Sequence, residues 1–215
     1  MDQHNRQDRA NETGPRTKEP SQKRAMHTHA ELLRTAEVLV ANEGCDAVTT
    51  TRIAAETGLS VGTIYRYFAN REALLLATYD ATVERIVEAC AAHIGTLDGD
   101  LVADEVIVAT IDAYLAAAQA IPAHSPLLRE MQRLRPIADD HAQNHDRIAA
   151  EIFLPLLGRF GLAGVSADPG RLAAIQSIIS ILVDLYLAME NDEARETIRA
   201  ELKAHALFAF SRLLD

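Results

Sequence analysis

The segment Thr49 to Leu76, TTTRIAAETGLSVGTIYRYFANREALLL, constrains the fold of this chain more than any other segment. It predicts two short helices joined by a tight turn and followed by the start of a third helix. Ile53, Leu59 and Ile64 recur at spacings that let the two short helices bury one face against each other. Gly58 lies at the corner, where the chain leaves the first helix with a positive φ that a residue bearing a Cβ adopts only at a cost.

Three helix starts are marked by side chains that can accept a hydrogen bond from the first turn. Thr49, Ser60 and Asn70 precede the first, second and third of these helices. A further, supporting helix is predicted from His27 to Asn42, and Gly44 follows it. Its apolar stripe consists of Leu32, Leu33, Ala36, Leu39 and Val40. Two helices at a glycine turn with such support are typical of a helix-turn-helix, which reads the major groove of DNA.

The stretch Gly44 to Leu75 resembles the DNA-binding domain of the TetR (tetracycline repressor) family of bacterial regulators. The elements of that signature appear in order as Thr49, Ile53-Ala54, Gly58-Leu59-Ser60, Gly62-Thr63-Ile64-Tyr65, Phe68 and Arg71. The sequence departs from the family at Val40 and Cys45, where aromatic residues are usual, and at Arg52, where an acid is frequent. The resemblance covers about 50 residues, and the rest of the chain resembles the family only in length and helical pattern.

Helix geometry divides the second short helix between core and surface. Ile64 and Phe68 are four residues apart, share a face and are expected to be buried. Thr63 and Arg66 can bond base edges, Val61 can touch a thymine methyl group, and the other predicted contacts are to phosphates. The predicted DNA-binding residues are Thr49, Thr51, Arg52, Val61, Thr63, Tyr65, Arg66, Tyr67 and Arg71. For the two tyrosines, the alternative is a packed ring with an exposed hydroxyl.

The net charge of −10 at pH 7 is unevenly distributed. Residues 1–72 carry ten basic and ten acidic side chains, so the whole excess of acid lies in residues 73–215. Counterion release depends on local basic groups, so this distribution is compatible with DNA binding at the N-terminal end. It is equally the distribution of a protein kept soluble by an acidic surface.

The chain divides into three predicted parts. Residues 1–26 have almost no apolar side chains and are expected to form a disordered arm, in which Lys23 and Arg24 could reach a groove. Residues 27–72 form the DNA-binding domain, and residues 73–215 form an all-α bundle for ligand binding and dimerisation. Helical periodicity is found at Asn70–His93, Leu101–Ala120, Leu127–Leu134, Asp139–Phe160, Asp168–Glu190 and Glu193–Leu214, with a kink or break expected after Phe153 because Pro155 lacks an N–H.

The last two predicted helices carry more apolar surface than one bundle can cover. The first has Ile175, Ile178, Ile179, Leu182, Val183 and Tyr186, and the second has Leu202, Leu207, Phe208, Phe210, Leu213 and Leu214. The resemblance implies that they pack against their twins as a four-helix bundle in a C2 homodimer. A fully intramolecular core is the alternative.

A cavity between the connecting helix and the bundle is the expected ligand site. Its predicted lining is Ile107, Ile111, Tyr114, Leu128, Met131, Phe153 and Tyr186, with Leu115 beside them and Asp112, His124, His141 and Gln176 as polar contacts. Such a lining suits a hydrophobic or amphipathic molecule. An apolar stripe is, however, more often simply core.

No motif for catalysis or for a cofactor is found. The sequence lacks GxSxG, P-loop, CxxC and HExxH patterns, so we expect no enzyme activity, no cofactor and no metal. A metal site was considered at Asp140, His141, His145 and Asp146, but no third ligand is identifiable and these residues are interpreted as solvated. A redox-sensing role for Cys90 is not favoured either, because the only basic residue near enough to lower its pKa is Arg85, about one turn away. No apolar leader or uninterrupted membrane span is present, which predicts a cytoplasmic protein without a membrane partner.

The sequence thus predicts a transcriptional regulator, most simply a repressor, that binds a palindromic double-stranded operator as a homodimer and is released by a small-molecule inducer. The alternative from another class is a helical ligand-binding or scaffolding dimer that has lost sequence-specific DNA binding.

Overall fold

The computed structural model describes residues 19–136, 139, 147–160 and 169–214, and within these ranges the chain forms helices and connecting turns without a strand. The elements in order are α1 (Glu19–Glu43), η1 (Cys45–Ala47), α2 (Thr50–Thr57), α3 (Val61–Tyr65), α4 (Arg71–Thr96), α5 (Ala103–Gln119), α6 (His124–Leu134), η2 (Ala149–Phe153), α8 (Leu154–Arg159), α9 (Pro169–Ala188) and α10 (Asp192–Leu214). The predicted all-α fold is confirmed.

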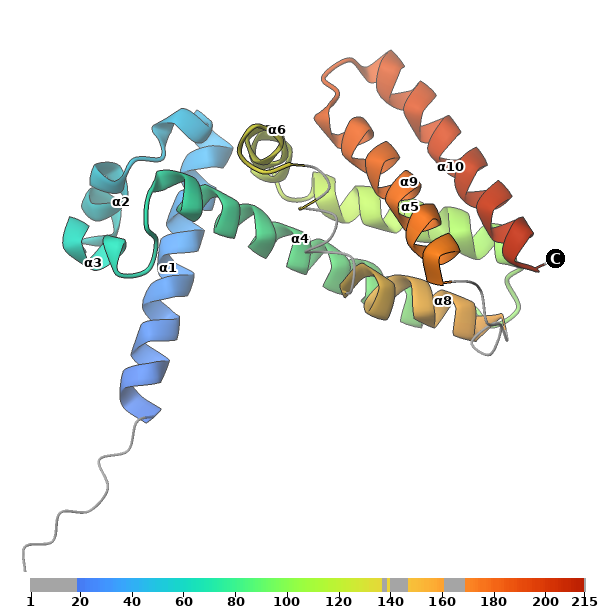
Figure 1. Cartoon of the computed structure of the whole chain (residues 1–215), viewed down its shortest axis with the longest axis horizontal. Coiled ribbons are helices and arrows are strands. Elements are labelled where there is room, and N and C mark those ends of the chain that lie inside the picture. Colours follow the sequence, from blue (N-terminus) through green and yellow to red (C-terminus); the bar gives the residue numbers. More distant parts are fainter. Residues whose placement is uncertain (1–18, 137–138, 140–146, 161–168, 215) are drawn as a thin grey trace, which may run out of the picture.

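An N-terminal head is formed by α1, α2, α3 and the first turns of α4 (Figure 1). Its core consists of Leu32, Ala36, Leu39, Val40, Val48, Ile53, Ile64 and Phe68, all buried. The stripe expected on the first helix therefore faces inward, and only Leu33 of that stripe is half-buried. The head has its own apolar core, as an independently packed unit requires.

Helix α1 begins at Glu19, whereas the sequence predicted a disordered arm up to residue 26 and a helix from His27. Residues 22–27 are exposed, so tertiary packing does not explain the extra turns. Gln, Lys, Arg, Ala and Met are good helix formers, and adding a turn to an existing helix costs little because nucleation is already complete. Pro20 lies in the first turn, where backbone N–H groups have no acceptor within the helix, so the N–H that proline lacks is not needed there.

Helix α4 connects the head to a C-terminal body. It extends from the head and packs against α5, α6 and η2, while α9 and α10 pair on the far side of α5 (Figure 1). Helix α6 lies at the junction, where it contacts α1 and η1 of the head as well as α4 and α9. A change in the body can therefore reach the head through two elements, α4 and α6.

The chain changes helix type at the point where the sequence predicted a kink or break. Residues Ala149–Phe153 form a π-helical turn, and an α-helix begins at Leu154. Pro155 has no N–H to donate to the preceding turn, and the wider π-helical turn accommodates that loss while the chain stays helical. The first part of the helix predicted over residues 139–160 lies outside the described residues.

Helix α9 exposes an apolar face. Ile178, Ile181 and Leu185 are 51%, 49% and 40% exposed, and Phe208 of α10 is 66% exposed. Residues Gly170–Ala188 are long and apolar enough to cross a membrane by length and composition alone. The sequence predicted no uninterrupted membrane span, and polar residues do interrupt this segment, but its average composition is that of a span and the single chain leaves much of it uncovered.

Candidate nucleic-acid interface and effector pocket

The starts of α2, α3 and α4 are each capped by a local hydrogen bond. The hydroxyl of Thr49 accepts from the Arg52 N–H at 3.1 Å, Ser60 Oγ accepts from the Thr63 N–H at 3.0 Å, and Asn70 Oδ1 accepts from the Ala73 N–H at 2.8 Å. Gly58 ends α2 with φ 69°, in the left-handed region. All three predicted caps and the predicted glycine conformation are confirmed.

Helix α3 presents the expected residues to solvent. Tyr65 is 51% exposed and Val61 37%, and Arg66 at the end of the helix is also exposed. Ile64 and Phe68 are buried from the same helix and the turn after it. Because the two buried side chains anchor the helix, the side chains on its opposite face are held toward solvent.

Three other predicted contact residues lie around this face. Thr51 is exposed in the first turn of α2, and the Thr63 hydroxyl lies 2.9 Å from that of Ser60. Tyr67 is half-buried, and its ring centroid lies 6.3 Å from that of His29 on α1. The ring of Tyr67 is therefore packed, as the alternative considered for the tyrosines predicted. The ring of Tyr65 is exposed and does not match that alternative.

Arg52 is held by two carboxylates. Its guanidinium donates to Glu43 at 2.9 Å and to Glu56 at 2.8 Å, and all three side chains are partly exposed. A phosphate contact from Arg52 would have to compete with both partners. Exposed ion pairs of this kind contribute little to stability, so that exchange is inexpensive.

Arg71 braces the head against the body. Its guanidinium donates to the carbonyl oxygens of Val48 and Cys45 at 2.8 and 2.7 Å. It also lies 3.5 Å from the carboxylate of Glu130 on α6. The guanidinium therefore links η1 and the residue after it to the start of α4 and to α6, a role that the sequence did not suggest.

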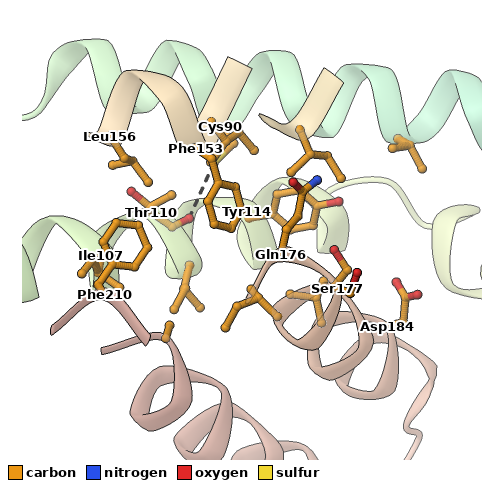
Figure 2. A pocket seen from close by; sticks show the side chains of 18 of the residues that line it. Cys90, Ile107, Thr110, Tyr114, Phe153, Leu156, Gln176, Ser177, Asp184 and Phe210 are labelled. Carbon is orange, nitrogen blue, oxygen red and sulfur yellow. Dashed lines mark hydrogen bonds between the residues drawn. The ribbon is translucent and has the colours of Figure 1, made fainter. Parts of the chain in front are cut away.

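A cavity of about 100 Å³ lies in the body between α4, α5, η2 and α9 (Figure 2). It is larger than a single water needs, roughly 10–15 Å³ by this measure. Its lining is Tyr79, Val83, Cys90, Ile107, Thr110, Ile111, Tyr114, His124, Ile148, Ile152, Phe153, Leu156, Gln176, Ser177, Ile179, Ser180, Val183, Asp184, Ala206 and Phe210. Of the predicted ligand residues, Ile107, Ile111, Tyr114, Phe153, His124 and Gln176 line it.

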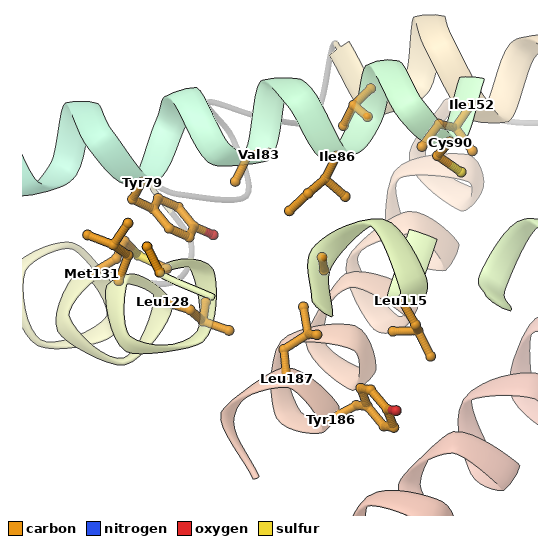
Figure 3. Packing of buried hydrophobic residues seen from close by; sticks show 14 of the residues in the cluster. Tyr79, Val83, Ile86, Cys90, Leu115, Leu128, Met131, Ile152, Tyr186 and Leu187 are labelled. Atoms are coloured by element: carbon orange, nitrogen blue, oxygen red, sulfur yellow. The ribbon is translucent and has the colours of Figure 1, made fainter. Parts of the chain in front are cut away.

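Other predicted ligand residues lie elsewhere. Leu128 and Met131 are buried on the face of α6 that packs toward α4 (Figure 3). Tyr186 is buried, and its hydroxyl accepts from Gln119 Nε2 at 3.0 Å. Leu115 is buried but is not among the residues around the cavity, and Asp112 pairs with Arg199 and Lys203 at 2.6 and 2.8 Å. His141 lies outside the described residues.

His124 is buried at the first turn of α6 and stays uncharged at neutral pH. Burial, assisted by the charge of Arg85, lowers the pKa of His124 from 6.5 to about 4. The Thr82 hydroxyl donates to the Tyr79 carbonyl oxygen at 2.6 Å and lies 2.8 Å from His124 Nδ1. Since that hydroxyl proton is engaged, Nδ1 carries the imidazole proton and Nε2 is left as an acceptor.

Cys90 is fully buried at the wall of the cavity. Its thiol lies 3.6 Å from the Thr110 carbonyl oxygen, and burial raises the pKa of Cys90 to about 11. The thiolate is the reactive form, so this cysteine behaves as an apolar wall residue.

The sequence did not identify the polar side of the cavity on α9, formed by Ser177, Ser180 and Asp184. These three residues recur at three- and four-residue spacing and so share one side of the helix. Their spacing was the available signal. It was obscured by the isoleucines and leucines between them.

The family description "Bacterial regulatory proteins, tetR family" matches residues 32–78, which comprise most of the head. The match includes the capped turn and the exposed face of α3. Residues 32–78 thus form a DNA-binding domain of the TetR family. With this domain, the protein is a DNA-binding transcriptional regulator.

Solved structures of bacterial regulators are similar in fold over most of this chain. One is a TetR-family transcriptional regulator from Streptomyces coelicolor, with 19% identity, a TM-score of 0.59 and coverage of 82% of this chain and 96% of that one. AlkX from Dietzia sp. strain DQ12-45-1b has 19% identity, a TM-score of 0.59 and coverage of 85% and 95%. FadR from Bacillus halodurans has 16% identity, a TM-score of 0.53 and coverage of 84% and 93%. No curated protein sequence matches the chain.

Proposed function

We propose that this TetR-family protein is a ligand-responsive repressor that binds a palindromic operator as a homodimer. The observation that carries the proposal is the division of α3, in which Ile64 is buried while Val61, Tyr65 and Arg66 are exposed. A helix held in this way can enter the major groove without rearranging the head. Acting on the chromosome of a bacterium, the protein would work in the cytoplasm.

Direct reading of bases is assigned to Val61, Thr63 and Arg66. A valine methyl group suits the thymine methyl, and hydroxyl and guanidinium groups suit base acceptors. Contacts to phosphates are assigned to Thr49, Thr51, Tyr65 and Tyr67, whose hydroxyls can donate. Arg52 and Arg71 remain candidates for phosphate contacts, but each would exchange existing partners for the DNA.

Dimerisation is assigned to the apolar face of α9 and α10. Ile178, Ile181, Leu185 and Phe208 are too exposed for a stable single chain in water, and a second copy would cover them. A two-fold axis there places the two heads in successive major grooves, about 34–36 Å apart, and demands a palindromic site. The same burial explains how a helix with the composition of a membrane span can serve a water-soluble regulator.

Coupling between ligand and DNA is assigned to α4 and α6. Tyr79 and Val83 of α4 and His124 of α6 line the cavity, while Arg71 at the start of α4 meets Glu130 of α6 at the head. A ligand that moves α6 against α4 would therefore act on the Arg71–Glu130 contact, through which α6 meets η1 and the start of α4. A coupling free energy of about 1–3 kcal/mol would weaken operator binding about 5- to 150-fold.

The cavity supports an effector with a hydrophobic body. Most of its lining is aliphatic or aromatic. The AlkX structure is described as implicated in biodegradation of n-alkanes and the FadR structure as that of a fatty acid degradation regulator, so the fold hosts regulators tied to aliphatic compounds.

Operator binding can be tested by gel shift or fluorescence anisotropy on the intergenic DNA upstream of the protein's own gene, with random duplex as competitor at ~150 mM salt. The wild type should bind the intergenic DNA more tightly than random duplex. Tyr65→Ala and Arg66→Ala should each lose about 10- to 100-fold in affinity, with an unchanged melting temperature. Arg171→Ala, which removes an exposed charge from α9 in the body, should leave affinity unchanged. Equal binding to both duplexes would favour the ligand-binding or scaffolding dimer instead.

A further inference from the structure

His124 is a buried polar residue in the wall of the cavity. It opens α6 and is 2% exposed. Its ring stacks on the ring of Tyr79 with centroids 5.6 Å apart, and its Nδ1 lies 2.8 Å from the hydroxyl of Thr82. The imidazole therefore joins α6 to α4 and borders the cavity. A nitrogen buried in this way normally has a hydrogen-bond partner, so each nitrogen of the ring has to be accounted for.

The position of the imidazole proton is fixed by Thr82. The hydroxyl oxygen of Thr82 lies 2.6 Å from the carbonyl oxygen of Tyr79, and two oxygens this close share a hydrogen between them. A hydroxyl has one hydrogen, so Thr82 cannot also donate to His124, and Nδ1 donates to the hydroxyl oxygen instead. Burial lowers the pKa of His124 to about 4, so the ring carries a single proton at pH 7.5. Nε2 is therefore an acceptor.

Nε2 has no hydrogen-bond partner among the described residues, yet it keeps contact with open space. In the described part of the chain, fully enclosed side-chain nitrogens without a partner occur on Arg159 and Arg195, and Nε2 of His124 is not one of them. Because His124 as a whole is buried and lines the cavity, the open space that Nε2 touches is the cavity. The wall thus presents an acceptor to any molecule inside.

The rest of the lining favours an uncharged donor. Within the described residues no Lys or Arg lines the cavity, and Asp184, the one carboxylate there, already interacts with another group of the protein. Residues 137–138, 140–146 and 161–168 contain no Lys or Arg in their sequence. A ligand carboxylate would therefore find no opposite charge, and an ammonium group would have to displace the existing contact of Asp184. A hydroxyl needs neither.

We propose that the cavity binds small aliphatic alcohols through a hydrogen bond from the ligand hydroxyl to Nε2 of His124. The inference rests on the proposed function in taking the cavity as the effector site. The ligand is short, because the cavity of about 100 Å³ is smaller than the roughly 150 Å³ of an engineered cavity that holds benzene. Since His124 joins α6 to α4, the ligand would bind where the two helices that reach the head meet.

The test is NMR titration of the full-length protein, without DNA, at pH 7.5 with n-pentanol, butyl methyl ether and pentanoate. The alcohol and the ether are isomers, but the ether has no donor and would leave Nε2 unpaired. The alcohol should therefore bind about 5- to 100-fold more tightly than the ether, and pentanoate should bind most weakly. With isotope-labelled histidine, the Nε2 resonance of His124 should move on addition of the alcohol and not of the ether.

Two variants locate the effect at the imidazole. His124→Phe keeps an aromatic ring beside Tyr79 but removes Nε2, so the alcohol and the ether should bind within about 2-fold of each other. His93→Phe, a matched loss of an exposed imidazole from α4 outside the cavity lining, should preserve the preference. If His124→Phe does not fold, Thr82→Val removes the oxygen to which Nδ1 donates. The imidazole proton can then move to Nε2, and the preference for the alcohol should fall.

Equal binding of the two isomers, tightest binding by pentanoate, absence of binding by all three compounds, or a proton on Nε2 in the wild type would overturn the inference. A preference unchanged in both His124→Phe and Thr82→Val would do the same. Binding of n-pentanol that depends on His124 but leaves the operator complex intact would uphold the inference and count against release by ligand in the proposed function. Release of the operator by the ether or pentanoate in place of the alcohol would overturn the inference and leave the proposed repressor standing.

Discussion

Helices α3 and α9 place opposite kinds of side chain on their exposed faces. In α3 the buried residue is Ile64 and the exposed ones include Tyr65 and Arg66 next to it in sequence, so the head satisfies its own apolar groups and leaves hydrogen-bonding groups outside. In α9 the exposed residues are aliphatic, and the side that lines the cavity carries Ser177, Ser180 and Asp184 beside Ile179 and Val183. The head therefore buries its own apolar groups, whereas α9 leaves an apolar face uncovered in the single chain.

The largest expected effect follows from the outer side of α9. Ile181→Glu and Phe208→Glu each put a charge where a second copy would be buried, and loss of one large apolar side chain from an interface costs about 1.5–3 kcal/mol before the charge is counted. We expect the dimer dissociation constant to rise by at least about 100-fold, as measured by sedimentation. Leu154→Glu on α8, equally exposed but off this face, should leave the dimer intact. A dimer that survives both changes would place the interface elsewhere.

The two faces of α3 should separate stability from recognition. Ile64→Ala removes a fully buried side chain from the core of the head and should lower the free energy of unfolding by about 2–5 kcal/mol. Val61→Ala, three residues earlier on the exposed side, should change stability by less than about 0.5 kcal/mol while weakening operator binding. Chemical denaturation with anisotropy on the same samples distinguishes them. Loss of stability in Val61→Ala would show that this face is part of the core.

His124 should make stability depend on pH. Its pKa is about 4 in the folded protein and 6.5 when exposed, so below pH 6.5 the unfolded chain takes up a proton that the folded one does not. Stability should therefore fall as pH falls from 6.5 to 4, by at most about 3 kcal/mol from this residue, and be unaffected by it above pH 6.5. The difference in unfolding free energy between wild type and His124→Gln should shrink across that window. A difference that is constant with pH would show that His124 is not buried in a neutral form.

The smallest effect concerns the turn that separates α2 from α3. Gly58→Ala meets no atom within 4 Å but must adopt φ 69°, so it should cost about 1 kcal/mol. Gly95→Ala, also without a neighbour within 4 Å but inside α4, should instead stabilise by up to about 1 kcal/mol. Thermal melts of the two variants should move in opposite directions.

The head was predictable because its determinants are local. Thr49, Ser60 and Asn70 cap helices through bonds spanning three residues, and Gly58 requires one backbone conformation, so a short window of sequence contains the cause. The start of α1 at Glu19 was not predicted, because the N-terminal residues were judged by their polar composition alone. The low cost of adding turns to an existing helix was not considered.

The cavity was only partly predictable because its lining depends on how helices pack. Met131 and Tyr186 satisfy the same apolar pattern as Ile111 and Phe153, but the first two face other helices. Which side of α5, α6 or α9 borders the cavity is set by contacts between segments far apart in sequence. Arg71 is a similar case, because its partner Glu130 is remote along the chain.

The central claim is that two copies of the exposed face of α3 read one operator, and footprinting of the upstream intergenic DNA tests it most directly. Full-length protein should protect two inverted half-sites on one side of the duplex, centred about 10–10.5 base pairs apart or a multiple of this, and Arg66→Ala should lose protection at both. Protection that is absent, that lacks two-fold symmetry, or that is unchanged in Arg66→Ala would contradict the account.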